Sequence, residues 1–227
     1  MLVARLFISL SLSLSLFIAM LTSVPAAASA TPEQQLREAA ARGDAAQVSA
    51  LLAQGASIDA RDGQGRTALL LATHHNRVQA AQVLIDAGAN VNAQDAIHDS
   101  PYLYAGARGH NEILRLTLAH GADLRSTNRY GGTALIPAAE RGHVETVRML
   151  IAAGVAVDHV NRLKWTALLE AIILGNGGAA HTEIVRLLVQ AGANVNLADG
   201  DGVTPLQHAR QRGYTQIERI LRDAGAR

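Results

Sequence analysis

The strongest constraint on the fold of this chain is an internal period of 33 residues. Four hydroxyl residues mark the period, because Thr67, Ser100, Thr133 and Thr166 follow one another at that spacing, and Thr204 comes 38 residues later. A fixed period of this length is typical of a stacked array, in which each unit buries its apolar faces only against its neighbours. The sequence therefore predicts an elongated repeat domain rather than a globule around one central core.

Each repeat carries the signals of two short helices. The hydroxyl residue is a predicted N-cap, whose side-chain oxygen accepts a hydrogen bond from a backbone N–H of the first helical turn. Pro101 and Pro205 directly follow two of these caps, at the helix position where a missing N–H costs nothing. The predicted ends of the first helices are Asn76, Gly109, Gly142 and Gly213. The predicted ends of the second helices are Gly88, Gly121, Gly154, Gly192 and Gly225.

These marks resemble the ankyrin repeat family, whose pattern is D-x-x-G-x-T-P-L-H-x-A-A-x-x-G-H, then a second helix and G-A-D-V-N. The stretches "GGTALIPAAERG", "VTPLQHARQRG" and "AAQVLIDAGANVNAQD" carry the resemblance, which covers nearly all of residues 32–227. It implies an all-α solenoid of about six helix-turn-helix units, with β-hairpin fingers projecting where the units join. The expected units are 32–62, 63–95, 96–128, 129–161, 162–199 and 200–227.

The sequence departs from the family pattern at a few positions. His98 and Lys164 stand where the family has the fingertip glycine. Pro137 falls inside a first helix, where it is expected to disturb one hydrogen bond. Five extra residues, Gly175 to Ala179, separate the two helices of the unit 162–199. We expect them to form a loop, because loops tolerate insertions, and we expect the preceding helix to run on through "LLEAIIL".

The first 30 residues have the pattern of a secretory signal peptide. Arg5 precedes a Leu/Ser-rich apolar run, and the small residues Ala28-Ser29-Ala30 form a cleavage site. The sequence therefore predicts a signal peptide at 1–30 and a mature repeat domain at 31–227, with an uncleaved membrane anchor as the alternative. The expected location is the periplasm, and secretion beyond it is the alternative.

Charge and motifs argue against nucleic-acid binding and catalysis. Removing Arg5 from the 20 basic residues leaves 19 against 19 acidic ones, so bulk charge favours neither nucleic acid nor an anionic membrane. The chain lacks cysteine and shows no G-x-S-x-G, H-E-x-x-H or Walker A pattern. We therefore assign no catalytic residue, cofactor or metal. Adjacent histidines on a helix point about 100° apart and cannot easily share one ion, although a metal- or small-molecule-handling protein is kept as an alternative function.

Recognition of another protein is the predicted function, because repeat arrays present an extended concave surface. The resemblance implies contacts through the fingertips and the inner faces of the first helices. The candidate residues on the fingertips are Ile97, Arg129, Tyr130, Arg162, Leu163 and Trp165. The candidate residues in the groove are His74, His75, Arg108 and Arg141.

The residue types of the fingertip set support this prediction, because Tyr, Trp and Arg are enriched at interface hot spots. The alternative is that these side chains pack between neighbouring fingers. The mature chain is expected to be a monomer that binds a protein outside the cytoplasm. A second possibility is an effector delivered to another cell.

Overall fold

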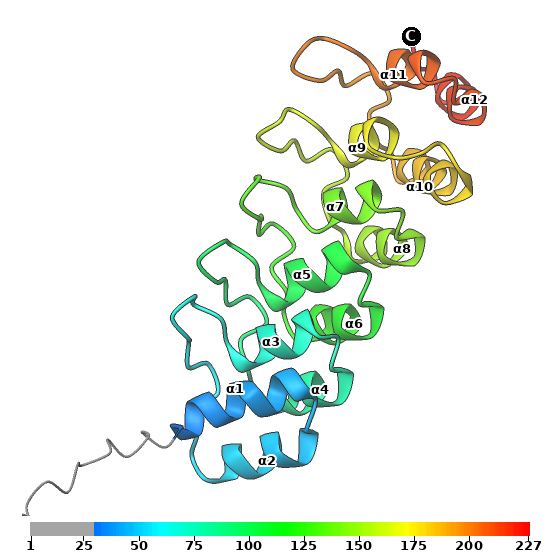
Figure 1. Cartoon of the computed structure of the whole chain (residues 1–227). Helices are drawn as coiled ribbons and strands as arrows, with labels where there is room; N and C mark the ends of the chain where they lie inside the picture. The colour runs from blue at the N-terminus through cyan, green and yellow to red at the C-terminus, as the bar shows by residue number, and fades with distance from the viewer. Residues whose placement is uncertain (1–29) are drawn as a thin grey trace, which may run out of the picture. The chain divides into compact units, whose positions relative to one another are not determined.

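The computed structural model describes residues 30–227, and the repeat domain occupies Pro32–Arg227. Its twelve helices form six pairs stacked one on the next (Figure 1). They are α1 (Pro32–Arg42), α2 (Ala45–Ala53), α3 (Ala68–His74), α4 (Val78–Asp86), α5 (Pro101–Arg108), α6 (Asn111–Ala119), α7 (Leu135–Glu140), α8 (Val144–Ala153), α9 (Ala167–Ile173), α10 (Ala179–Gln190), α11 (Pro205–Gln211) and α12 (Thr215–Asp223). The predicted signal peptide lies, except for Ala30, outside the described residues.

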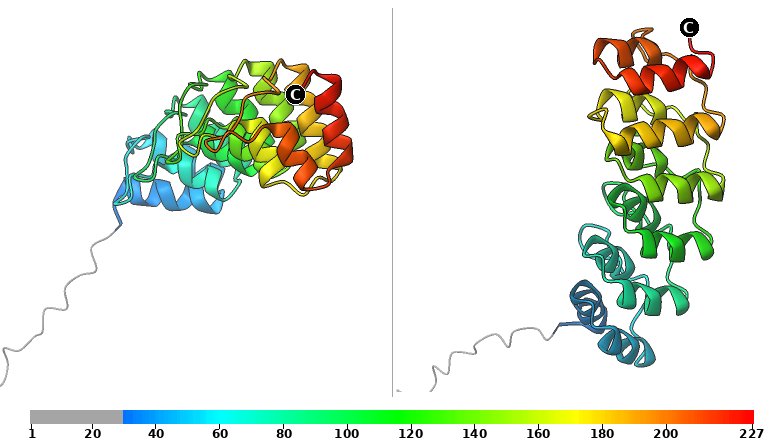
Figure 2. Two further views of the ribbon diagram at one scale, coloured as in Figure 1. Left: turned by 90° about the horizontal axis from the view of Figure 1, so that it is seen from above. Right: turned by 90° about the vertical axis from the view of Figure 1, so that its right-hand side faces the viewer.

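The helices form two layers. The odd-numbered helices, which we call the inner helices, pack on one another along the stack, and the even-numbered outer helices do the same (Figure 2). Small residues allow this close approach. A Cβ atom added at Gly106 of α5 would lie 2.8 Å from the Cβ of Ala134 in the next repeat. Each inner helix from α3 to α11 has a fully buried alanine at the same repeat position, namely Ala72, Ala105, Ala138, Ala171 and Ala209.

Four of the five predicted N-caps are confirmed. The hydroxyl oxygen of Thr67 accepts a hydrogen bond from the N–H of Leu70 at 3.2 Å, three residues later. The same bond recurs in three further repeats, at Ser100, Thr166 and Thr204. A side chain at this position therefore satisfies one of the unpaired donors of the helix start.

The fifth predicted cap, Thr133, is wrong, and Pro137 supplies the physical reason. Pro137 has no N–H to donate to the carbonyl of Thr133. That carbonyl instead accepts from the N–H of Ile136 at 3.2 Å, which is the donor that a capping hydroxyl would have used. The Thr133 hydroxyl is consequently buried without a hydrogen-bond partner among residues 30–227, and α7 begins one residue later than its counterparts.

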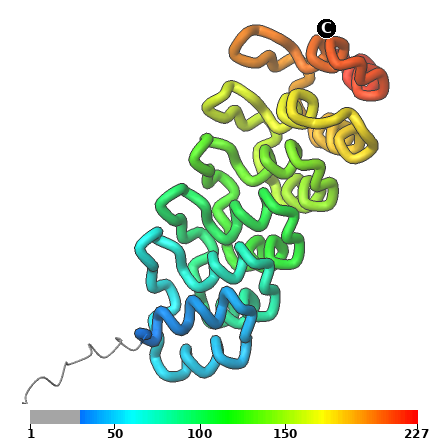
Figure 3. The backbone as a smooth tube through the Cα atoms, viewed as in Figure 1, coloured from blue at the N-terminus to red at the C-terminus, as the bar shows by residue number. Residues whose placement is uncertain are grey.

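Five fingers project from the stack between successive helix pairs (Figure 3). The predicted β-hairpins are wrong, because residues 30–227 contain no β-strand. Each finger is instead a five-residue turn, closed where its first residue donates a backbone hydrogen bond to the carbonyl four positions on. Asn161 donates in this way to Trp165 at 3.0 Å. The predicted glycine substitutes His98 and Lys164 do adopt left-handed backbones at the tips, with φ of +63° and +64°.

The inserted segment of the unit 162–199 joins two repeats. The hydroxyl of Tyr214 donates to the carbonyl of Gly175 at 2.9 Å, and its ring lies directly against Gly177. The last inserted residue, Ala179, begins α10, which at 12 residues is the longest of the described helices. The expected extension of the preceding helix is wrong, because α9 ends at Ile173 after 7 residues, as many as α3 has. The insertion therefore connects the last two helix pairs.

Candidate protein-binding surface

Three apolar side chains stand at the same position on successive fingers. Ile97, Tyr130 and Leu163 are 49%, 54% and 53% exposed, and we call them the fingertip row. A side-chain hydrogen bond fixes the backbone of each fingertip. The side-chain oxygen of the first finger residue accepts it from the backbone N–H of the tip residue. About half of the surface of each of these side chains is therefore open to solvent.

The remaining fingertip candidates are partly buried or make contacts with neighbouring residues. Trp165 is only partly exposed. Arg162 donates from its guanidinium to the carbonyl of Arg129 at 2.8 Å, so it holds one finger to the next. The guanidinium of Arg129 lies 4.9 Å from the centre of the Tyr130 ring and 3.9 Å from the carboxylate of Asp99. Of the three, Arg129 is the one that faces the groove behind the fingers.

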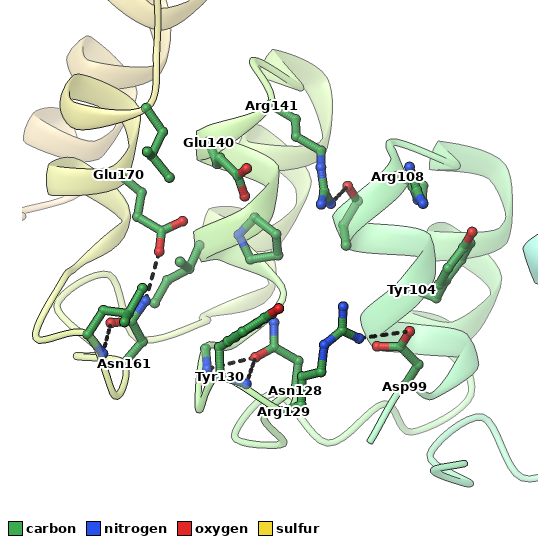
Figure 4. A pocket seen from close by; sticks show the side chains of 16 residues that line it. Asp99, Tyr104, Arg108, Asn128, Arg129, Tyr130, Glu140, Arg141, Asn161 and Glu170 are labelled. Carbon is green, nitrogen blue, oxygen red and sulfur yellow. Dashed lines mark hydrogen bonds and ion pairs between the residues drawn. The ribbon is translucent and has the colours of Figure 1, made fainter. Parts of the chain in front are cut away.

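A concave pocket of about 350 Å³ lies between the fingers and the inner helices α5, α7 and α9 (Figure 4). Tyr130 and Leu163 of the fingertip row form part of its rim, and Pro137 and Glu170 line it from the helices. Leu174, just after α9, is 50% exposed and also lines it. The pocket and the fingertip row therefore form one continuous surface.

The two predicted groove arginines both line this pocket. The guanidinium of Arg108 lies 5.3 Å from the centre of the Tyr104 ring. Arg141 donates to the carbonyl of Ala107 in the preceding repeat at 2.7 Å. Within the described part of the chain, no carboxylate lies within ion-pair distance of either arginine. Their positive charges are consequently available to a ligand.

One carboxyl group of the pocket is almost fully buried. Glu170 is 5% exposed, and its Oε1 accepts a hydrogen bond from the side-chain amide of Asn161 at 2.7 Å. Burial raises the pKa of Glu170 to about 7, and the negative charge of Glu140 adds to the effect. The bond from Asn161 and the charge of Arg141 oppose this rise. The neutral form of this carboxyl group therefore persists to a higher pH than that of an ordinary glutamate.

The two groove histidines do not line the pocket. The ring of His74 is tilted against that of Tyr104, with the ring centres 4.2 Å apart. Its buried Nε2 has no hydrogen-bond partner in the described part of the chain. Burial lowers the pKa of His74, which favours its neutral form. His75 is exposed beside it. In residues 30–227, no three His, Cys, Asp or Glu side chains lie close enough to hold a metal ion together.

Several pocket residues were not among the sequence candidates. They are Asp99, Tyr104, Asn128, Glu140, Asn161, Glu170 and Leu174. One sequence signal points to the pair Asn161–Glu170. The first residue of a finger and the residue nine positions later are both polar there, as they are at Asp199 and His208, which are hydrogen-bonded at 2.7 Å. In the fold, the residue nine positions later contacts the base of its own finger. The sequence spacing alone does not indicate this contact.

Comparison with known proteins agrees with this architecture. The family model described as ankyrin repeats (3 copies) matches residues 102–199 and 158–227, and a second, ankyrin repeats (many copies), matches 36–85. The chain belongs to the ankyrin repeat family. A crystal structure of an ankyrin repeat domain from Acinetobacter baumannii AYE is 67% identical, with a TM-score of 0.83, and covers 85% of this chain and 98% of that one.

Other ankyrin proteins resemble this chain less closely. The ankyrin repeat protein EF0377 is 43% identical, with a TM-score of 0.81 and coverage of 86% of this chain and 98% of that one. The ankyrin domain of Bcl-3, a member of the IkappaB family, is 29% identical with a TM-score of 0.76, over 85% of this chain and 86% of that one. The putative ankyrin repeat protein YahD of Escherichia coli K12 is 47% identical over 57 residues, which are 25% of this chain and 28% of that relative.

Ankyrin repeat domains are protein–protein interaction scaffolds and are generally not enzymes. The all-α solenoid expected from the sequence is thus present. In addition, no helix within residues 30–227 combines the length and the apolar character that crossing a membrane requires.

Proposed function

We propose that this protein is an exported, non-enzymatic scaffold that binds another protein through its fingertip row and the concave pocket. One observation carries the proposal. Tyr130 and Leu163 are each more than half exposed, and both belong to the fingertip row and to the rim of the pocket. An aromatic and an aliphatic side chain beside a pocket are the kind of anchor from which protein interfaces draw most of their binding energy.

The N-terminal sequence supports export. We propose the periplasm as the site of action and a monomer as the state of the mature chain. Arg5, the apolar run and Ala28-Ser29-Ala30 have the order of a cleavable secretory signal. We expect the mature protein from an exporting host to begin at Thr31, which N-terminal sequencing measures. An intact Met1, or protein that stays in the membrane fraction, would show that the segment is an anchor.

Site-specific photo-crosslinking tests the binding surface. A photoreactive phenylalanine analogue replaces Tyr130 or Leu163 in the living cell, and Arg115 on the outer helix α6 is the control position. Arg115 is exposed and lies outside the pocket. We expect one discrete protein adduct from each fingertip position and none from Arg115. Adducts from Arg115 alone would move the binding surface to the outer helices.

A further inference from the structure

The two ends of the concave pocket differ in charge. Arg108 and Arg129 lie at the α5 end, with Arg141 beside them, whereas Glu140 and Glu170 lie toward α9 (Figure 4). Asp99 pairs with Arg129 at 3.9 Å, and all three arginines oppose the rise in the pKa of Asp99 that burial causes. The negative charges of Asp99 and Asp95 both act on Arg129. Three guanidinium groups therefore stand against two carboxylates at this end of the pocket, which leaves an excess of positive charge.

Asn128 adds a hydrogen-bond donor to the arginine end, since no bond from its side-chain NH₂ is formed within the described residues. Oδ1 of Asn128 accepts from the N–H groups of Tyr130 and Gly132, which leaves the side-chain NH₂ as a donor. In the next finger the equivalent NH₂ of Asn161 donates to Glu170, but nine residues after Asn128 stands Pro137, which offers no side-chain acceptor. Asn128 lines the pocket, so its NH₂ is available to a ligand there.

The opposite end of the pocket offers apolar contact. Leu163 and Leu174 are about half exposed there. Because the pKa of Glu170 lies near 7, this carboxyl group adds only part of a negative charge at neutral pH. An apolar side chain would cover the two leucines and remove their surface from water.

We propose that the pocket binds an acidic–apolar pair in an extended segment of the partner protein. The carboxylate lies among Arg108, Arg129 and Arg141, and the adjoining apolar side chain covers Leu163 and Leu174. Guanidinium groups bind carboxylates through paired, charge-assisted hydrogen bonds, and Asn128 supplies one further donor. This inference rests on the proposed binding function and adds the chemistry of the partner.

The test uses three capped peptides of about ten residues that differ at one position. Each carries leucine after glutamate, glutamine or lysine in a Gly/Ser background. They are titrated into the exported, purified protein, and the Nε–H resonances of its arginines are followed by NMR. We expect the glutamate peptide to shift the resonances of the pocket arginines and to bind at least about tenfold more tightly than the glutamine peptide. Higher salt should weaken this binding.

Arginine variants connect the binding to the pocket. Arg108→Gln should weaken binding of the glutamate peptide about tenfold. Arg108 is the safer single change, because within residues 30–227 its guanidinium stacks on Tyr104 and makes no hydrogen bond. The double variant Arg108→Gln/Arg141→Gln should bind the glutamate and glutamine peptides alike. Arg115→Gln/Arg219→Gln removes the same charge from two exposed outer-helix positions and should change nothing.

Two results would overturn this inference. Tightest binding by the lysine peptide, lost in Glu140→Gln, would assign the pocket to a basic partner. No shift of pocket resonances with any peptide would show that the acidic–apolar pair is not the ligand. Both results leave the photo-crosslinking test of the proposed function unaffected, because that test does not depend on the charge of the partner.

Discussion

Replacing Glu170 by glutamine should make the stability of this protein less dependent on pH. The glutamine keeps an oxygen that can accept from Asn161, and it removes the group that ionises. Glu170 has a pKa of about 7 in the folded protein against an ordinary value of 4.5. At about 1.4 kcal/mol for each pH unit, this difference corresponds to at most about 3.5 kcal/mol. Because the carboxyl group borders an open pocket, solvent screening reduces the expected effect to about 2 kcal/mol.

The sign follows from proton linkage. Below pH 4.5 both the folded and the unfolded chain hold the proton, so the favourable contribution of the neutral group is fully present. Between pH 4.5 and about 7 the unfolded chain ionises first, and the free energy of unfolding falls as the pH rises. Above about pH 7 the loss is complete. Glu170→Gln should therefore match the wild type near pH 4.5 and exceed its stability by about 2 kcal/mol at pH 8.

Urea unfolding at a series of pH values from 4.5 to 8, followed by far-UV circular dichroism, measures this difference. Glu112→Gln is the matched control, because it makes the same change at an exposed position in the first turn of α6. The control should follow the wild type to within about 0.5 kcal/mol at every pH. A Glu170→Gln protein that is less stable than the wild type at pH 8, or a difference that does not vary with pH, would refute the reasoning.

Four further substitutions test the packing and capping of the repeats by the same unfolding assay. Tyr102→Phe removes a buried hydroxyl group that has no partner within residues 30–227, so stability should stay constant or rise by up to about 1 kcal/mol; a loss above that would reveal a hidden hydrogen bond. Gly177→Ala should lower the free energy of unfolding by at least about 2 kcal/mol, because φ is +67° and the new Cβ would lie 2.4 Å from the ring of Tyr214. An unchanged urea midpoint would mean that the insertion does not hold the last two repeats together. Thr166→Ala should cost about 1 kcal/mol through the lost cap, whereas Thr133→Ala should cost less, and equal losses would contradict the cap assignment.

Local signals in the sequence were sufficient for most of the helical architecture. Thr67 and Ser100 act as caps as predicted, because a cap depends only on the residues of its own helix start. The prediction for Thr133 was wrong because of Pro137, four residues later. Pro137 cannot donate to the Thr133 carbonyl, so the N–H of Ile136 donates to that carbonyl instead of to the hydroxyl. The predicted β-hairpins failed because five-residue turns leave no length for a strand ladder.

The pocket was only partly predictable. The 33-residue register placed Arg108 and Arg141 in one groove, and the structure finds both in the pocket lining. The raised pKa of Glu170 could not be predicted, because it arises from burial in the fold and from the charge of Glu140 in the preceding repeat. The partial burial of Trp165 could likewise not be predicted from its position in the sequence, two residues beyond Leu163.

The most direct test of the central claim is the affinity of the cross-linked partner for Tyr130→Ala/Leu163→Ala. These two residues are preferred to Trp165 because both are more than half exposed, so their removal should change the free energy of unfolding by no more than about 0.5 kcal/mol. Loss of buried anchors typically costs about 2 kcal/mol or more, which weakens binding by at least about thirtyfold. Calorimetric titration with the purified partner should show that loss in a variant that unfolds like the wild type. An affinity equal to that of the wild type would contradict the claim that this surface binds the partner.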